Sequence, residues 1–366
     1  MERAVGDDPD EDFLPPSWQF QDEPAEEDQP ELAFWPVAER RRPDPLLIPL
    51  ARAQDAVARL EASVERASPD LATGLRARVA LHEASGYLGH WHTTVHPRDL
   101  ALHDAGLTGS YAAASILGTL ANELPWSFAE GAARDVAPKD WLADQALRYA
   151  RLWQQLPAAG SRQAIRRPDE WRSCLALLGA GALSEEAVES WVAALPSRTE
   201  VPGLLAAADT VARGLPEHGR RDHLDLPSTY VAACVWHLHG FGQSIALPFW
   251  SAPLSRIDAL SQKAGADFQI GYLDCVTEAA LRARRGLSAL RSVECRFSAL
   301  KFGGRSHLAD AAAFALREPV VTARSLGEGI GLSTRSALDL LKRLADEDLV
   351  REATGRLAWR AFVMEG

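Results

Sequence analysis

Five of the ten histidines lie close together in the chain, between residues 82 and 103, with acidic residues among them. Imidazole nitrogens and carboxylate oxygens are ligands that zinc and other divalent metals take from proteins. The spacing does not favour such a site, because HExxH is absent and two of the histidines are separated by one residue, as in a strand. We therefore interpret the group as surface-loop or hydrogen-bonded side chains, and we predict no metal and no cofactor. The group is His82, His90, His92, His96 and His103, with Glu83, Asp99 and Asp104.

Motifs for nucleophilic catalysis and phosphate binding are also absent from the sequence. The chain contains no GxGxxG, no P-loop and no GxSxG, and no serine or cysteine has a recognisable base partner. His237 and His239 end an apolar segment just before Gly240, where a cation would complement a helix C-terminus. The sequence therefore predicts that the protein is not an enzyme.

The cysteines and the overall composition indicate a protein of the cytoplasm. The cysteines are far apart, form no CxxC pair and lie in apolar neighbourhoods, which predicts buried, reduced thiols. No segment approaches the roughly 18–20 apolar residues of a membrane helix, and the first residues lack a secretory pattern. With 47% hydrophobic and 24% charged residues among 366, we expect a cytoplasmic globular protein of two or three domains. The cysteines are Cys174, Cys234, Cys275 and Cys295.

The clearest functional pattern lies in the segment that begins at Pro319. Apolar residues three and four apart predict one helix before Gly331 and a second helix after Ser333. Gly331 is a typical helix end and Ser333 a typical N-cap. Helix, tight turn and helix form the unit that places its second helix in a DNA major groove. The apolar positions are Ala323, Leu326, Ile330, Leu332, Ala337, Leu338, Leu341 and Leu344.

A short hairpin comes after the second of these helices. Residues 349–351 and 357–363 have strand character, and Thr354 with Gly355 predicts the turn between them. A hairpin in this position is the wing of a winged helix. The predicted fold class is therefore an all-α body with a C-terminal winged helix-turn-helix that contains a small β-wing.

The net charge of this segment does not favour DNA binding, but the positions of its basic residues do. Residues 318–366 contain seven bases and eight acids. Arg335 lies in the first turn of the second helix, where such helices meet base edges, and the wing bases lie near a phosphate backbone. We place the acids Asp346, Glu347 and Asp348 in the following loop, away from that face. The predicted DNA-binding residues are Thr334, Arg335, Ser336, Lys342, Arg343, Arg351, Arg356 and Arg360.

The body that would position this unit is predicted to be helical throughout. Apolar residues at helical spacing, interrupted by joints rich in glycine and proline, define its segments. We divide the chain into an acidic, proline-rich arm at residues 1–45, a helical domain at 46–300 and the winged helix-turn-helix domain at 301–366. The predicted helices are 46–68, 71–88, 99–105, 110–124, 141–156, 169–178, 184–195, 201–214, 228–239 and 267–290.

The N-terminal arm holds the whole net charge of the chain. Residues 1–31 contain twelve acids and one base, a net charge of −11, which equals the charge of the full sequence. Five prolines between residues 15 and 36 interrupt it, and this composition is typical of disorder. Its aromatic residues leave two interpretations open. The arm is either a solubilising tail or a segment that contacts another protein or the protein's own winged helix.

Three separated stretches also carry a family resemblance. Residues 95–105, VHPRDLALHDA, are close to a family form VHLEDLVLHDA, and residues 350–362, VREATGRLAWRAF, are close to an ending of the kind REMTGRGRFRAW. Residues 226–250 lead from an apolar helix into a leucine-proline loop. In these stretches the chain resembles a family of uncharacterised plasmid-associated proteins of rhizobia and other α-proteobacteria. Its members combine a domain of unknown function with their own C-terminal helix-turn-helix. The resemblance implies DNA binding and supplies no catalytic residues, and the acidic N-terminus departs from it.

A second resemblance concerns architecture alone. A helical body, a connector over residues 267–280 and a C-terminal winged helix are similar to some Fic proteins. The Fic loop HPFxxGNGR supplies a base histidine and a phosphate cradle, and it is absent here, where the nearest residues are 239–242. This resemblance implies a relative without catalytic activity.

The sequence supports two functional hypotheses from different classes. The first is a regulator of transcription that binds double-stranded DNA through its winged helix, with a homodimer left open and no membrane partner. The second is a non-enzymatic accessory module whose winged helix and acidic arm contact other proteins.

Overall fold

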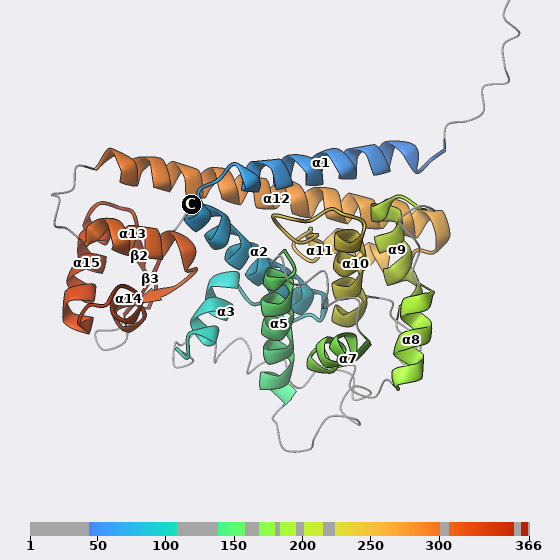
Figure 1. Ribbon diagram of the computed structural model, residues 1–366, viewed down its shortest axis with the longest axis horizontal. Coiled ribbons are helices and arrows are strands. Elements are labelled where there is room, and N and C mark those ends of the chain that lie inside the picture. The colour runs from blue at the N-terminus through green and yellow to red at the C-terminus, as the bar shows by residue number, and fades with distance from the viewer. Residues whose placement is uncertain are drawn as a thin grey trace, which may run out of the picture. The chain divides into compact units, whose positions relative to one another are not determined.

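The protein is mostly α-helical, with a small antiparallel sheet near its C-terminus (Figure 1). The computed structural model describes residues 44–107, 138–157, 168–179, 184–194, 201–214, 224–300, 307–354 and 360–364. This architecture confirms the predicted fold class. The predicted helix at 110–124 and most of the predicted arm lie outside the described residues. None of the described helices is long and apolar enough to cross a membrane.

The helices of the body correspond closely to the predicted segments. Among the described residues of the body, the one addition is α11, which begins directly after the predicted joint at 240–253, in a stretch for which no helix was predicted. The body helices are α1 (Leu47–Glu65), α2 (Pro69–His90), α3 (Pro97–Asp104), α5 (Pro138–Gln155), α7 (Pro168–Leu177), α8 (Glu185–Ala193), α9 (Gly203–Arg213), α10 (Leu226–Leu238), α11 (Leu254–Leu260) and α12 (Gly265–Ala299).

Helices α1 and α12 lie side by side along much of their length (Figure 1). The apolar stripe of α1 is buried at Ala53, Val57 and Leu60, as its helical spacing predicts. Helix α12 extends beyond the predicted end at Leu290. Its buried positions continue to Val293, and the helix ends at Ala299. The extra length presents a longer surface to its neighbours than the sequence pattern indicates.

Helix α2 is the element around which the body packs. Ser68 accepts a hydrogen bond from the Leu71 amide at 3.3 Å, and Pro69 occupies the first helical position, which together favour helix initiation there. The helix is buried on several faces because it packs against α3, α5, α11, α12 and α13 (Leu308–Arg317). It contacts both the body and the C-terminal unit.

A buried carboxylate joins α2 to the loop before α11. Glu83 Oε2 accepts hydrogen bonds from the amides of Phe249 at 2.9 Å and Trp250 at 2.8 Å. Glu83 Oε1 accepts from the amide of Ser251 at 3.0 Å and from its hydroxyl at 2.6 Å. Burial raises the pKa of Glu83, against the lowering effect of these four hydrogen bonds. Three loop amides thereby obtain a partner inside the core.

The loop approaches α2 so closely that only glycine fits at position 86, about one helical turn after Glu83. A Cβ on Gly86 would overlap the carbonyl oxygen of Trp250. The indole of Trp250 is fully buried, and its Nε1 donates to Thr229 Oγ1 at 2.8 Å. The loop is therefore held by α2 on one side and by α10 on the other.

The C-terminal unit has the element order of a winged helix. Helix α13 precedes β1 (Val321–Thr322), α14 (Ala323–Ile330), α15 (Thr334–Asp346), β2 (Arg351–Glu352) and β3 (Ala361–Val363). The strand order is β1-β3-β2, and both pairings are antiparallel. Phe362 lies opposite Val321 in one pair and opposite Glu352 in the other. Helix α13 and strand β1 are further elements that the sequence analysis did not predict.

We expect opposite effects from two glycine-to-alanine changes in helix interiors. Gly86→Ala should destabilise the protein by about 1–3 kcal/mol or more, because the backbone of Trp250 must move. Gly286→Ala is the matched control in α12, where an added Cβ would meet only Leu75 Cδ1 at 3.8 Å. It should stabilise the helix by up to about 1 kcal/mol. Urea denaturation of both variants tests this, and equal midpoints would contradict the close approach.

Candidate nucleic-acid interface

The turn between α14 and α15 has the local structure that its residue types predict. Gly331 ends α14 in the left-handed conformation, with φ of 72°. Ser333 is the N-cap of α15, and its hydroxyl accepts from the amide of Ser336 at 3.2 Å. The predicted helix end and the predicted N-cap are both confirmed. This turn sets the angle at which α15 leaves α14.

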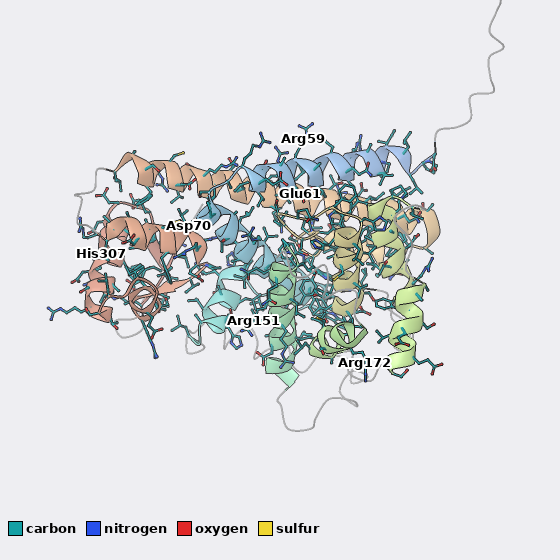
Figure 2. All side chains as sticks on the ribbon, viewed as in Figure 1. Arg59, Glu61, Asp70, Arg151, Arg172 and His307 are labelled. Atoms are coloured by element: carbon teal, nitrogen blue, oxygen red, sulfur yellow. The ribbon has the colours of Figure 1, made fainter. Side chains whose placement is uncertain are left out.

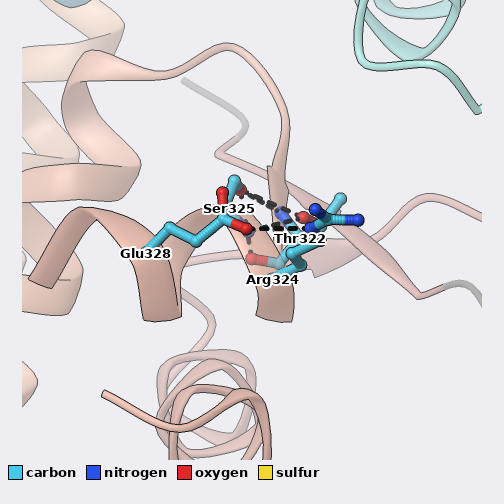
Figure 3. Close-up of polar contacts among 4 residues, drawn as sticks. All are labelled: Thr322, Arg324, Ser325 and Glu328. Carbon is cyan, nitrogen blue, oxygen red and sulfur yellow. Dashed lines mark hydrogen bonds and ion pairs between the residues drawn. The ribbon is translucent and has the colours of Figure 1, made fainter. Parts of the chain in front are cut away.

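The start of α14 is fixed by a reciprocal pair of hydrogen bonds (Figure 3). The amide of Ser325 donates to Thr322 Oγ1 at 2.9 Å, and the amide of Thr322 donates to Ser325 Oγ at 3.0 Å. Beside this capping box, Arg324 and Glu328 form an exposed ion pair at 2.8 Å. The capping box satisfies two amides that the first turn would otherwise leave without partners.

Helix α15 has one buried and one exposed face. Ala337, Leu341 and Leu344 are completely buried, at positions that share one side of the helix, and α15 packs against α13 and α14. The opposite side faces solvent. Its exposed residues are Thr334, Arg335, Ser336, Asp339, Lys342, Arg343 and Asp346.

Bases and acids alternate along part of this exposed face. Lys342 lies 3.9 Å from Asp339, at the limit of an ion pair. Arg335 and Arg343 form no ion pair with any residue that the structure describes. Asp346 is the last residue of α15 and not part of the following loop, so the prediction for this residue was wrong. Helical spacing places it on the same side as Lys342, which reduces the positive charge of this face.

The wing residues differ in how exposed they are. Arg351 is exposed on β2. Arg360 is half-buried and lies 3.7 Å from Glu352 on the neighbouring strand, so part of its charge is already neutralised. Arg356 lies outside the described part of the chain. Arg360 directly precedes β3, so the pairing of β3 with β2 brings it beside Glu352, the residue that follows Arg351.

An arginine of the body holds the winged helix at the C-terminal end of α13. The guanidinium of Arg78 donates to the carbonyl oxygens of Leu316 at 2.8 Å, Ala315 at 3.2 Å and Glu318 at 3.1 Å. Burial lowers the pKa of Arg78 to about 10, with Glu318 acting in the opposite sense. The last carbonyls of a helix lack partners within it, and a cation there complements the helix dipole. Sequence analysis did not identify this residue.

Two further contacts support the same junction. A Cβ on Gly74 would overlap the carbonyl oxygen of Leu316, so α2 and α13 approach closely there. Asp70, at the start of α2, lies 3.5 Å from the Nε of Arg317 (Figure 2). The winged helix is therefore joined to the body through α2 by hydrogen bonds, charge and close packing.

The clustered histidines have different partners in the structure. His90 Nδ1 lies 2.9 Å from Asp258, His103 Nε2 lies 3.6 Å from Asp144, and His96 is the N-cap of α3. His92 is exposed with a positive φ of 57°. Within the described ranges, no three histidine, cysteine or carboxylate side chains converge as metal ligands.

One other prediction needs correction, and one is confirmed. Cys295 is exposed on α12 and Cys174 is only partly buried, so the prediction of four buried thiols was wrong for these two. His237 and His239 end α10, as predicted. Both are buried, and His237 Nδ1 lies 3.2 Å from the carbonyl oxygen of Gly242.

We expect His82 to make stability depend on pH. Burial, then the charges of Arg282 and His96, lower its pKa to about 4 from an ordinary 6.5. The unfolded chain therefore binds more protons between these values, and stability should rise as pH increases from 4 to 6.5. In urea denaturation, His82→Gln should reduce that rise, while the exposed control His92→Gln should leave it unchanged. Identical pH profiles for wild type and His82→Gln would contradict this assignment.

Comparison with known proteins adds no family assignment. No protein-family model matches the chain, and no curated protein shows a significant match to it. The resemblance to the plasmid-associated family and the resemblance to Fic architecture both stay predictions.

Proposed function

We propose that the protein binds double-stranded DNA through α15 and the wing, and that it acts as a regulator of transcription. The observation that supports this most directly is the exposure of Arg335, Ser336 and Arg343 on a helix whose other side is packed against α13 and α14. The recognition helix of a DNA-binding helix-turn-helix is held in the same way, which supports the proposal.

The positions along α15 match the two kinds of DNA contact. Thr334, Arg335 and Ser336 occupy the N-terminal turn, from which recognition helices contact base edges, and arginine pairs well with guanine. Lys342 and Arg343 lie about two turns further along, roughly 10 Å away, where they would meet phosphates. Arg351 on the wing would contact the backbone of the same duplex.

The body would serve to fix the orientation of this reading helix. The contacts of Arg78 and Gly74 with α13 join the winged helix to α2. A recognition helix that is held in one orientation loses less conformational entropy when it binds. A homodimer would present two such helices to the half-sites of a palindromic operator.

One observation favours the alternative of a protein partner. Arg335, Asp339, Lys342 and Asp346 alternate in charge along one side of α15. Such a stripe could form complementary ion pairs with another protein, whereas the two aspartates would repel phosphate groups. The two functions differ in the role of the arginines, which permits a direct test.

The double variant Arg335→Gln and Arg343→Gln should lose DNA affinity by at least about tenfold, since each good base contact contributes about 1–3 kcal/mol. A duplex selected from a random pool with the wild-type protein provides the target, and fluorescence anisotropy at several salt concentrations measures binding. Arg59→Gln is the control, because Arg59 is an exposed residue of α1 paired with Asp55 at 2.8 Å (Figure 2).

The outcome for the control and the salt dependence complete this test. Arg59→Gln should bind the duplex as the wild type does. The double variant should also show a smaller dependence of affinity on salt, because fewer phosphate contacts form. Equal affinity of the double variant and wild type would refute the proposed interface, and recovery of a defined protein partner without DNA would favour the alternative.

Removal of residues 1–31 should raise the affinity for DNA. These residues have a net charge of −11, and a duplex is strongly negative, so the repulsion should fall when they are absent. The comparison is made at low and at high salt, and the difference should be larger at low salt because screening is weaker there. Equal affinities of the two proteins at low salt would show that the arm does not oppose binding.

A further inference from the structure

A cavity lies where the body meets the winged helix. Its volume is about 370 Å³, which is in the range of small-molecule sites. Residues of α2, α3 and α12 line it from the body, and Pro319, Val363 and Met364 line it from the winged helix. A molecule in this cavity would therefore contact both parts at once.

The polar residues of the cavity are mainly arginine and histidine. Arg78, Arg98 and Arg282 line it together with His82 and His96, and no carboxylate is among the described lining residues. Cationic groups gathered around a cavity favour an anion, since an arginine binds carboxylate and phosphate groups through two parallel hydrogen bonds.

One of these arginines has an unsatisfied donor. The Nε of Arg98 is buried and makes no hydrogen bond in the described structure. Its nearest carboxylate oxygen belongs to Asp99 at 3.8 Å, beyond hydrogen-bond distance. A buried donor without a partner is costly, so a shift of the Arg98 side chain toward an acceptor in the cavity would be favourable.

Two observations support a positive potential inside the cavity. The pKa of His82 is lowered to about 4, first by burial and then by the charges of Arg282 and His96. The cavity also includes the start of α3, at His96 and Pro97, and the N-terminus of a helix has partial positive charge. An anion would lower this potential.

The rest of the cavity wall is apolar. It includes Leu75, Val79, Leu290, Val363 and Met364. An inorganic anion would leave these side chains facing water, whereas a molecule with an apolar part would cover them and gain from that contact. The wall therefore fits a ligand with an acidic group at one end and a hydrocarbon or aromatic part at the other.

We propose that this cavity binds a small amphipathic organic acid and that the bound acid acts on the winged helix through Val363 and Met364. Binding of the acid requires only the cavity. Its effect on DNA rests on the proposed function. The acidic group lies near Arg98 and Arg282, and the apolar part lies toward β3.

Anilinonaphthalene sulfonate is a suitable probe because it joins an aromatic part to one acidic group and fluoresces more strongly in apolar surroundings. N-phenylnaphthylamine has the same rings without the acid. We expect the sulfonate to bind the wild-type protein at least about tenfold more tightly than the double variant Arg98→Gln and Arg282→Gln. The uncharged probe should not distinguish the two proteins.

The control is Arg285→Gln, an exposed arginine of α12 that does not line the cavity. It should bind the sulfonate as the wild type does. Circular dichroism of each variant shows whether it is folded, and Arg282→Gln alone, at an exposed position, provides a second test with an intermediate loss of affinity. Unchanged sulfonate binding by the folded variants would overturn the proposed site.

The effect on DNA is measured separately, with the wild-type protein and saturating sulfonate. A change in DNA affinity that disappears in the Arg98→Gln, Arg282→Gln variant supports the regulatory part. Unchanged DNA affinity overturns that part and leaves the binding site standing. Arginine-dependent sulfonate binding by a protein that binds no DNA would instead refute the proposed function alone.

Discussion

The carboxylate of Glu83 is fully buried, and it accepts hydrogen bonds from three consecutive loop residues that lie more than 160 positions further along the chain. A carboxyl group in the protein interior is tolerated only where such donors replace water. Removing it would leave the amides of residues 249–251 without partners in the core. The path of this loop, and with it the packing of α11 against α2, depends on that side chain.

The same helix positions the winged helix by the reverse arrangement of hydrogen-bond donor and acceptor. Glu83 offers an acceptor to loop amides, whereas Arg78 offers donors to the last carbonyls of α13. Glu83 and Arg78 therefore both bind backbone groups that secondary structure leaves without a hydrogen-bond partner. The exposed face of α15 is thus carried on a unit whose attachment does not use α15 itself. The outward-facing residues of α15 are therefore available to a partner.

Local patterns predicted much of this structure. The types of Gly331 and Ser333 predicted the helix end and the N-cap, and apolar spacing predicted the buried face of α15, because these features depend on neighbours within a few residues. The two-residue strand β1 is too short for alternation to be visible. The helical position of Asp346 was also missed, since Glu347 comes directly after it and no glycine marks the helix end.

The least predictable features depend on residues distant in the chain. Nothing in the sequence distinguishes Arg78 from the other arginines. Its role appears only when α13 packs against α2, because the carbonyl acceptors at the end of α13 are 237 to 240 residues away. The cationic cavity likewise combines residues of six separate segments, none of which has a recognisable motif. Which of the predicted basic residues are already paired, as Arg360 is with Glu352, also depends on the strand register.

Arg78 contacts the winged helix and Glu83 contacts the 249–251 loop. Because both residues belong to one uninterrupted helix, the directions in which their side chains point are fixed relative to each other. Each residue added to an α-helix rotates all later residues of that helix by about 100°. A single insertion between these two positions would rotate one attachment point away from its acceptors, while the same insertion in a surface loop would be absorbed. The length of this five-residue interval is therefore expected to vary far less than the length of any connecting loop.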